Sequence, residues 1–118
     1  MSHPEVEQQL HAPVVKQELN HINTIDGGQA KFITHIEGLP RPTISWYRDD
    51  ELIQPSEEFE IAYSEEHIAS LFIHDVLPED AGTYVVVAEN EVGSVKTTAQ
   101  LQVEGKHVAM LENIYSHL

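Results

Sequence analysis

The sequence predicts an all-β domain folded as a two-sheet sandwich. Several short segments alternate apolar and polar residues between turn signals, a pattern typical of strands that bury one face. No helical periodicity interrupts this pattern between residues 13 and 103. Trp46 lies in the middle of one predicted strand, where a bulky apolar side chain would fill the space between two sheets. The 118 residues are enough for one domain with its own core.

The predicted strands follow one another along the chain. The first two end at Asp26-Gly27-Gly28, a strong turn signal. Pro40 and Pro42 mark another turn, because proline cannot donate to a sheet ladder. The predicted strands are residues 13–15, 19–25, 30–36, 44–47, 59–61, 71–73, 84–88 and 95–103.

The two ends of the chain depart from this pattern. Residues 1–12 are polar and without periodicity, and we interpret them as a leader or linker. Residues 104–118 form either a plain linker or a short amphipathic helix, whose apolar face would need a partner or the domain itself to lie on. The helical interpretation depends on the spacing of Leu111, Ile114, Tyr115 and Leu118, together with Val108.

A set of motifs occurs in a fixed order within residues 13–103. It comprises Gly38-Leu39-Pro40-Arg41-Pro42, Ile44-Ser45-Trp46-Tyr47, Leu71-Phe72-Ile73, Asp80-Ala81-Gly82-Thr83-Tyr84 and Ala88-Glu89-Asn90-Glu91-Val92-Gly93. These motifs resemble the intermediate-set (I-set) immunoglobulin domain of titin-like muscle proteins and adhesion receptors. The resemblance implies an immunoglobulin sandwich without catalytic activity.

The resemblance also assigns fold-defining roles to individual residues. Trp46 is expected to pack between Thr34 and Val86, which stand where the family has its two cysteines. Tyr84 is expected to donate its hydroxyl to a backbone carbonyl just upstream, as in the tyrosine corner. The fold-defining residues are Trp46, Tyr84, Asp80, Gly82, Thr34, Val86 and Leu71.

One position departs from the family. Many I-set domains carry an arginine early in the fourth strand that pairs with the aspartate of Asp-x-Gly-x-Tyr. Here the comparable stretch is Glu57-Glu58-Phe59. We therefore expect Asp80 to bond to the backbone, and we do not carry the salt bridge over.

Composition bounds the environment and the partners. The chain has no cysteine, which excludes disulfides and thiolate zinc sites and fits a reducing compartment. No Asn-x-Ser/Thr sequon occurs. The net charge of -14 disfavours nucleic acid and anionic membranes, which attract clustered Lys and Arg. The absence of cysteines and sequons favours a cytoplasmic location, and the resemblance to titin-like muscle proteins implies the myofibril or sarcomere.

The sequence shows no enzyme motif, and we expect no cofactor and no metal. The chain has 8 histidines, but none of them forms a zinc-binding motif. Candidate partner-binding residues instead lie on the outer face of the predicted sheet: Tyr47, Val85 and Val87. Ile33 and Phe72 form a smaller pair on the opposite face. Exposed valine also has a plain explanation, since valine suits strands whether or not anything binds them.

Three functions remain open. The first is a non-catalytic structural and protein-interaction module of a larger sarcomeric or cytoskeletal filament-associated protein. The resemblance implies protein partners such as myosin filaments, other sarcomeric proteins or actin, and the acidic balance favours the thick filament. The second is an extracellular adhesion or receptor domain. The third is an immunoglobulin domain that flanks a muscle kinase.

Overall fold

The computed structural model describes residues 9–105, and these residues form two sheets joined by turns. The all-β sandwich predicted from the sequence is confirmed. One short 3-10 turn, η1 (Pro78–Asp80), connects two of the strands. The strands are β1 (His11–Gln17), β2 (Ile22–Ile25), β3 (Ala30–Leu39), β4 (Thr43–Arg48), β5 (Glu51–Leu52), β6 (Phe59–Tyr63), β7 (Ile68–Ile73), β8 (Gly82–Glu89) and β9 (Ser94–Glu104).

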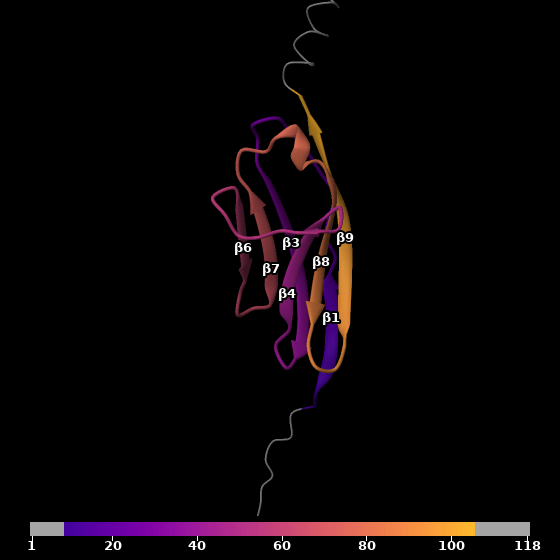
Figure 1. Cartoon of the computed structure of the whole chain (residues 1–118). Coiled ribbons are helices and arrows are strands. Elements are labelled where there is room, and N and C mark those ends of the chain that lie inside the picture. Colours follow the sequence, from indigo (N-terminus) through magenta and orange to yellow (C-terminus); the bar gives the residue numbers. More distant parts are fainter. Residues whose placement is uncertain (1–8, 106–118) are drawn as a thin grey trace, which may run out of the picture.

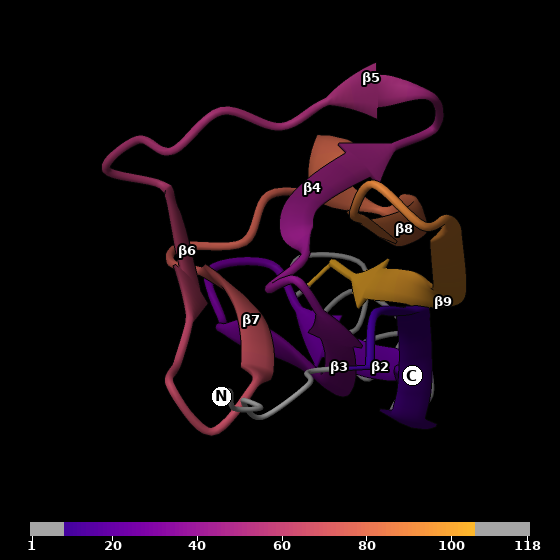
Figure 2. The same ribbon diagram turned by 90° about the horizontal axis from the view of Figure 1, so that it is seen from below.

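The two sheets pack face to face. One is four-stranded in the order β1-β3-β7-β6, and the other is five-stranded in the order β2-β9-β8-β4-β5. All pairings are antiparallel except that of β2 with β9, which is parallel. The described chain enters at one pole through β1 and leaves at the opposite pole through β9 (Figure 1). In the view along the strands, the segment from β5 to β6 spans one open side of the sandwich (Figure 2).

Strand alternation builds the core. In β3 the residues Ala30, Phe32, Thr34 and Ile36 are all buried, as the alternation predicted, whereas Lys31 and Ile33 are exposed. The same period of two buries alternate residues of β7 and β8. The two inner faces meet in one apolar cluster, so the sheets are held together by burial of side chains from both layers.

Several strand boundaries differ from those predicted. β1 begins at His11, inside the stretch interpreted as a leader, because His11 pairs with Leu39 and its carbonyl accepts a hydrogen bond from Asn90. The second strand covers only Ile22–Ile25 rather than 19–25. Leu19 is buried outside it, and its N–H donates to the Thr97 hydroxyl. Such boundaries depend on tertiary contacts that local periodicity does not contain.

The β4–β5 turn and the start of β8 lie close together at the carboxy-terminal pole. Asp49 and Asp50 join β4 to β5 with positive φ values of 47° and 73°, which two-residue hairpin turns require. Gly82 has φ 150°, and a Cβ there would lie 2.5 Å from the carboxylate of Asp49. Glycine is therefore needed at position 82, because the Asp49 carboxylate approaches the chain closely and accepts a hydrogen bond from Thr83 N–H.

Candidate protein-interaction face

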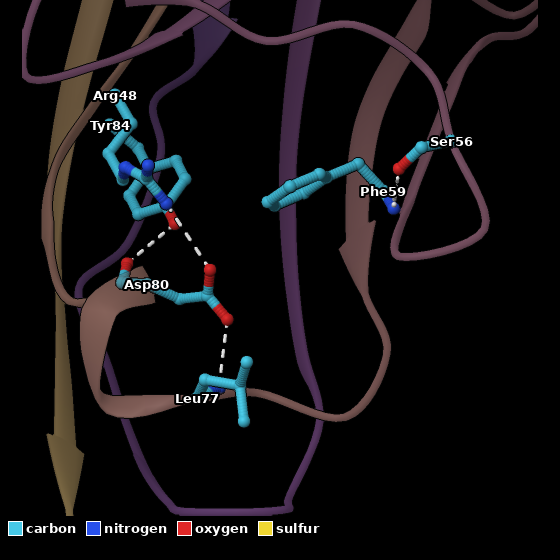
Figure 3. A network of polar contacts seen from close by, with 6 residues as sticks. All are labelled: Arg48, Ser56, Phe59, Leu77, Asp80 and Tyr84. Carbon is cyan, nitrogen blue, oxygen red and sulfur yellow. Dashed lines mark hydrogen bonds and ion pairs between the residues drawn. The ribbon is translucent and has the colours of Figure 1, made fainter.

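The tyrosine corner anchors the start of β8. The hydroxyl of Tyr84 donates to the main-chain oxygen of Asp80 at 2.6 Å (Figure 3). The ring is fully buried and packs on Phe32 with 4.9 Å between ring centroids. Burial raises the pKa of Tyr84 to about 12, so the phenol stays neutral and keeps its donor proton. The upstream carbonyl predicted as its partner is thus the carbonyl of Asp80.

The buried carboxylate of Asp80 has two kinds of partner. One oxygen accepts from the backbone N–H of Leu77 at 2.8 Å, which is the backbone bond expected from the sequence. The other oxygen pairs with the Arg48 guanidinium at 3.2 Å, and Figure 3 shows the carboxylate between these two partners. The expectation that Asp80 lacks a salt bridge is therefore wrong. The arginine comes from β4 instead of the fourth strand of the family pattern.

Glu58 lies in the stretch where many I-set domains carry the arginine. Burial raises the pKa of its carboxyl above the ordinary value, and the nearby carboxylate of Asp80 adds to the rise. The side chain thus places a second acid beside Asp80, and Arg48 lies close enough to offset part of the repulsion.

The remaining fold-defining residues lie in the core. Trp46 is directly opposite Val86 in the β4–β8 register, and both are buried with Leu71 in the same apolar cluster. Thr34 is also fully buried, and its hydroxyl donates to the Gln17 carbonyl at 2.6 Å. The indole N–H of Trp46 is buried without a hydrogen-bond partner in the described part of the chain.

The outer face of the five-stranded sheet brings the candidate partner-binding residues together. Tyr47 lies opposite Leu52 on one side and Val85 on the other, and Val87 lies in the adjacent row opposite Ser45. We call Tyr47, Leu52, Val85 and Val87 the β4–β8 patch. Tyr47, Val85 and Val87 are half-buried, and Leu52 is 53% exposed. Leu52 was missed in the sequence because its two-residue strand is too short to show alternation.

The surroundings of the β4–β8 patch are polar but carry few charges. Continuing the two rows across β9 adds Thr98 beside Val85 and Lys96 beside Val87. The acids near this face lie at its ends, with Asp49 and Asp50 in the β4–β5 turn and Glu89 at the end of β8. The β4–β8 patch is thus apolar at its centre, nearly uncharged around the centre and acidic at its rim. Such a surface is complementary to a protein surface that has an apolar centre and basic surroundings.

The opposite outer face differs from the predicted apolar pair. Phe72 lies opposite Lys31 in the register, whereas Ile33 lies opposite Ser70. Phe72 stacks on the imidazole of His74 at 4.2 Å between ring centroids, and His74 pairs with Glu60 at 3.1 Å. This face is thus dominated by an aromatic–imidazole stack rather than by Ile33.

A second anchor, which sequence reasoning missed, lies at the amino-terminal pole. The Arg41 guanidinium sits 4.1 Å from the ring centroid of Tyr63 and donates to the carbonyls of Tyr63 and Ser64. The Tyr63 hydroxyl in turn donates to the Ile36 carbonyl at 2.6 Å. In the sequence, the alternation of Phe59, Ile61 and Tyr63 indicates that Tyr63 shares the inward side of its strand. This alternation gives no sign of Arg41, which contacts Tyr63 from another turn.

The remaining observations concern the carboxy-terminal segment, metal binding and membrane spans. Leu111, Ile114, Tyr115 and Leu118 lie outside the described residues. Within residues 9–105, no group of three or more His, Cys, Asp or Glu side chains could hold a metal ion. No helix in that part of the chain is long and apolar enough to cross a membrane.

The motifs, the corner and the two-sheet topology agree with one family. The model of the immunoglobulin I-set domain matches residues 13–103. The chain belongs to the immunoglobulin I-set family. Its core contains buried Thr34 and Val86 and no disulfide, since the chain has no cysteine.

Similar I-set domains occur in muscle proteins. The chain is 41% identical to Drosophila melanogaster titin over 86% of its own length, and 36% identical to smooth muscle myosin light chain kinase of Gallus gallus over 78%. It is 33% identical to the muscle M-line assembly protein unc-89 of Caenorhabditis elegans over 88%. The chain spans only 1%, 5% and 1% of these relatives, respectively.

Solved I-set structures superpose closely on the chain. The titin M3 domain aligns with a TM-score of 0.76 and 34% identity, covering 81% of this chain and 99% of that domain. The titin domains Z1Z2, solved in complex with telethonin, align with a TM-score of 0.80 and 33% identity, covering 84% of this chain and 51% of theirs.

Proposed function

We propose that this I-set domain is a non-catalytic, load-bearing and protein-binding module of a larger sarcomeric protein in the cytoplasmic myofibril. The observation that carries the proposal is the path of the chain. The described segment enters at one pole and leaves at the other (Figure 1), and its strands β2 and β9 form a parallel pair. The similarity to muscle proteins supports the sarcomeric setting.

The parallel pair explains how such a module would carry load. Tension between the two ends pulls β2 and β9 in opposite directions, so the hydrogen bonds across the pair are loaded together in shear. The backbone N–H of Asp26 donates a hydrogen bond to the carbonyl of Glu104, at the end of β9. Because backbone groups alternate in direction along a strand, the N–H of Thr24, two residues earlier, also faces β9. The N–H of Asn23 points away.

Single-molecule stretching of tandem copies tests this role. Thr24→Pro removes a donor of the loaded pair and should lower the unfolding force. Asn23→Pro, which removes a donor on the other side of β2, is the matched control and should lower the force less. Equal forces for the two variants would argue against a load-bearing β2–β9 pair.

The binding role is assigned to the β4–β8 patch. Myosin filaments are the preferred partner, because an acidic domain is repelled by the acidic surface of an actin filament. Co-sedimentation with each filament would test this preference. Replacing Val85 and Val87 by serine should weaken binding to myosin filaments, whereas Ile33→Ser on the opposite face should not. Binding to actin alone would contradict the thick-filament assignment.

Other sarcomeric proteins are a further class of partner. The similar titin domains Z1Z2 form a complex with telethonin, which supports protein binding by this kind of domain. A second candidate function is that of an immunoglobulin domain flanking a muscle kinase, favoured by the similarity to myosin light chain kinase. The sequence of the parent protein on either side of the domain would distinguish the two.

A further inference from the structure

The open side of the sandwich exposes the outer edge of β6. β6 is the last strand of the four-stranded sheet and pairs only with β7. In the described chain, the segment that links β5 to β6 crosses this side without forming a strand (Figure 2). An edge of this kind presents unpaired N–H and C=O groups, which invite pairing with another strand.

The pairing with β7 defines which groups of β6 point outward. His74 N–H donates to the Glu58 carbonyl, and Ser64 N–H donates to the Ile68 carbonyl. Because the direction of backbone groups alternates along a strand, the groups of Glu60 and Ala62 also face β7. The N–H and C=O groups of Phe59, Ile61 and Tyr63 therefore face the open side.

Two residues of the chain itself occupy the ends of this outward edge. The backbone N–H of Ser56 donates to the Phe59 carbonyl at 3.0 Å, and the Ser56 hydroxyl accepts from Phe59 N–H at 3.2 Å (Figure 3). At the other end, Arg41 donates to the Tyr63 carbonyl at 2.8 Å. Only the N–H and C=O of Ile61 and the N–H of Tyr63 lack a partner among these contacts.

We propose that the outer edge of β6 is a strand-pairing site for a second copy of this chain, and that Arg41 and Ser56 keep it closed. Two copies of β6 arranged antiparallel about Ile61 would pair Ile61 with itself and Phe59 with Tyr63. These are the residues whose backbone groups face outward, so the edge is complementary to itself. With Arg41 and Ser56 in place, only the central pair could form both of its bonds.

The side chains allow the same register. It places Glu60 of one copy opposite Ala62 of the other, so no acid directly faces an acid across the junction. The net charge of -14 on each copy nevertheless opposes association, because the two copies repel each other. Arg41 thus blocks the edge by direct contact, and long-range repulsion adds to this effect.

The test compares the full chain with Arg41→Ala/Ser56→Ala by sedimentation velocity. Measurements in about 1 M NaCl reduce the charge repulsion, since the Debye length falls to about 3 Å. The double variant should self-associate with a dissociation constant at least about tenfold lower than that of the wild type. Lys96→Ala removes one positive charge on the other sheet, so it is the matched charge control and should behave as the wild type.

Amide hydrogen exchange locates the junction. In the double variant, the amides of Phe59 and Ile61 should gain protection as concentration rises, because Phe59 N–H and the Tyr63 carbonyl are the groups that the two substitutions free. The amide of Leu52 on the other sheet should not. A monomeric double variant, or association without protection at Phe59 and Ile61, would overturn the proposal. If the double variant does not fold, Arg41→Met replaces it, because methionine keeps an apolar stem beside Tyr63 but has no donor for the Tyr63 carbonyl. A monomeric folded Arg41→Met would then overturn the proposal.

Discussion

Thr34 donates its hydroxyl to the main-chain oxygen of Gln17 at 2.6 Å, and this bond ties β3 to β1. The resemblance to the I-set domain implies a cysteine at this position, directed across the core to the other sheet. Here the Thr34 side chain instead forms a hydrogen bond to a neighbouring strand in its own sheet. The two sheets are then held together by the apolar cluster between them, which includes Trp46 and Val86.

Thr34→Val should lower the free energy of unfolding by about 0.5–1.5 kcal/mol, the net contribution of one hydrogen bond. The valine keeps the apolar shape and loses only the donor. Urea denaturation measures the change, with Thr34→Ser as the control that keeps the hydroxyl. A Thr34→Val variant as stable as the wild type would mean that the Gln17 bond contributes nothing net.

Tyr84→Phe should lower the free energy of unfolding by about 1–3 kcal/mol, because the Asp80 carbonyl loses its buried donor. The variant should also respond differently to alkali. The raised pKa of Tyr84 stabilises the fold below the unfolded value near 10, and this stabilisation is lost as pH rises through about 12. Denaturation curves across this range should show a smaller alkaline loss for Tyr84→Phe, and equal losses would contradict the assignment.

Glu58→Arg should stabilise the domain at neutral pH, because it replaces an acid beside Asp80 with the charge that the family uses there. Glu58→Gln should stabilise it less, since it only removes repulsion. The raised pKa of Glu58 stabilises the fold at acid pH, below the ordinary glutamate value, and this stabilisation is lost as pH rises through the folded-state pKa. Thermal unfolding from acid to neutral pH measures both effects.

The gain for Glu58→Gln should therefore be small in acid and larger at neutral pH. A gain that is the same at all pH values would point to a packing effect instead. Glu57→Gln is the matched control, because Glu57 is an exposed acid in the same segment.

Trp46→Ala should lower the free energy of unfolding by about 3–5 kcal/mol, as truncation of a buried aromatic does. Trp46→Phe should cost much less, because the indole N–H has no hydrogen-bond partner among the described residues and its removal breaks no bond. Chemical denaturation of both variants gives the comparison. A Trp46→Phe cost close to that of Trp46→Ala would contradict this expectation.

The sequence by itself determined the sandwich, the approximate positions of most of its strands and most of its core. Alternation with period two is a local property, so it identified the inward residues of β3 and β8 without any knowledge of the partner strands. The corner at Tyr84 was equally accessible, since Asp80, Gly82 and Tyr84 lie within one short motif.

Only the tertiary structure decided the contacts that join distant turns. Arg48 reaches Asp80 across 32 positions, and Arg41 reaches Tyr63 across 22. Neither pair has a periodic signal, because long flexible cations can take partners from any segment that packs nearby. For a similar reason, β5 and the complete β4–β8 patch could be identified only from the structure. Leu52 joins Tyr47 only through a two-residue strand, whose place depends on the hairpin geometry at Asp49 and Asp50.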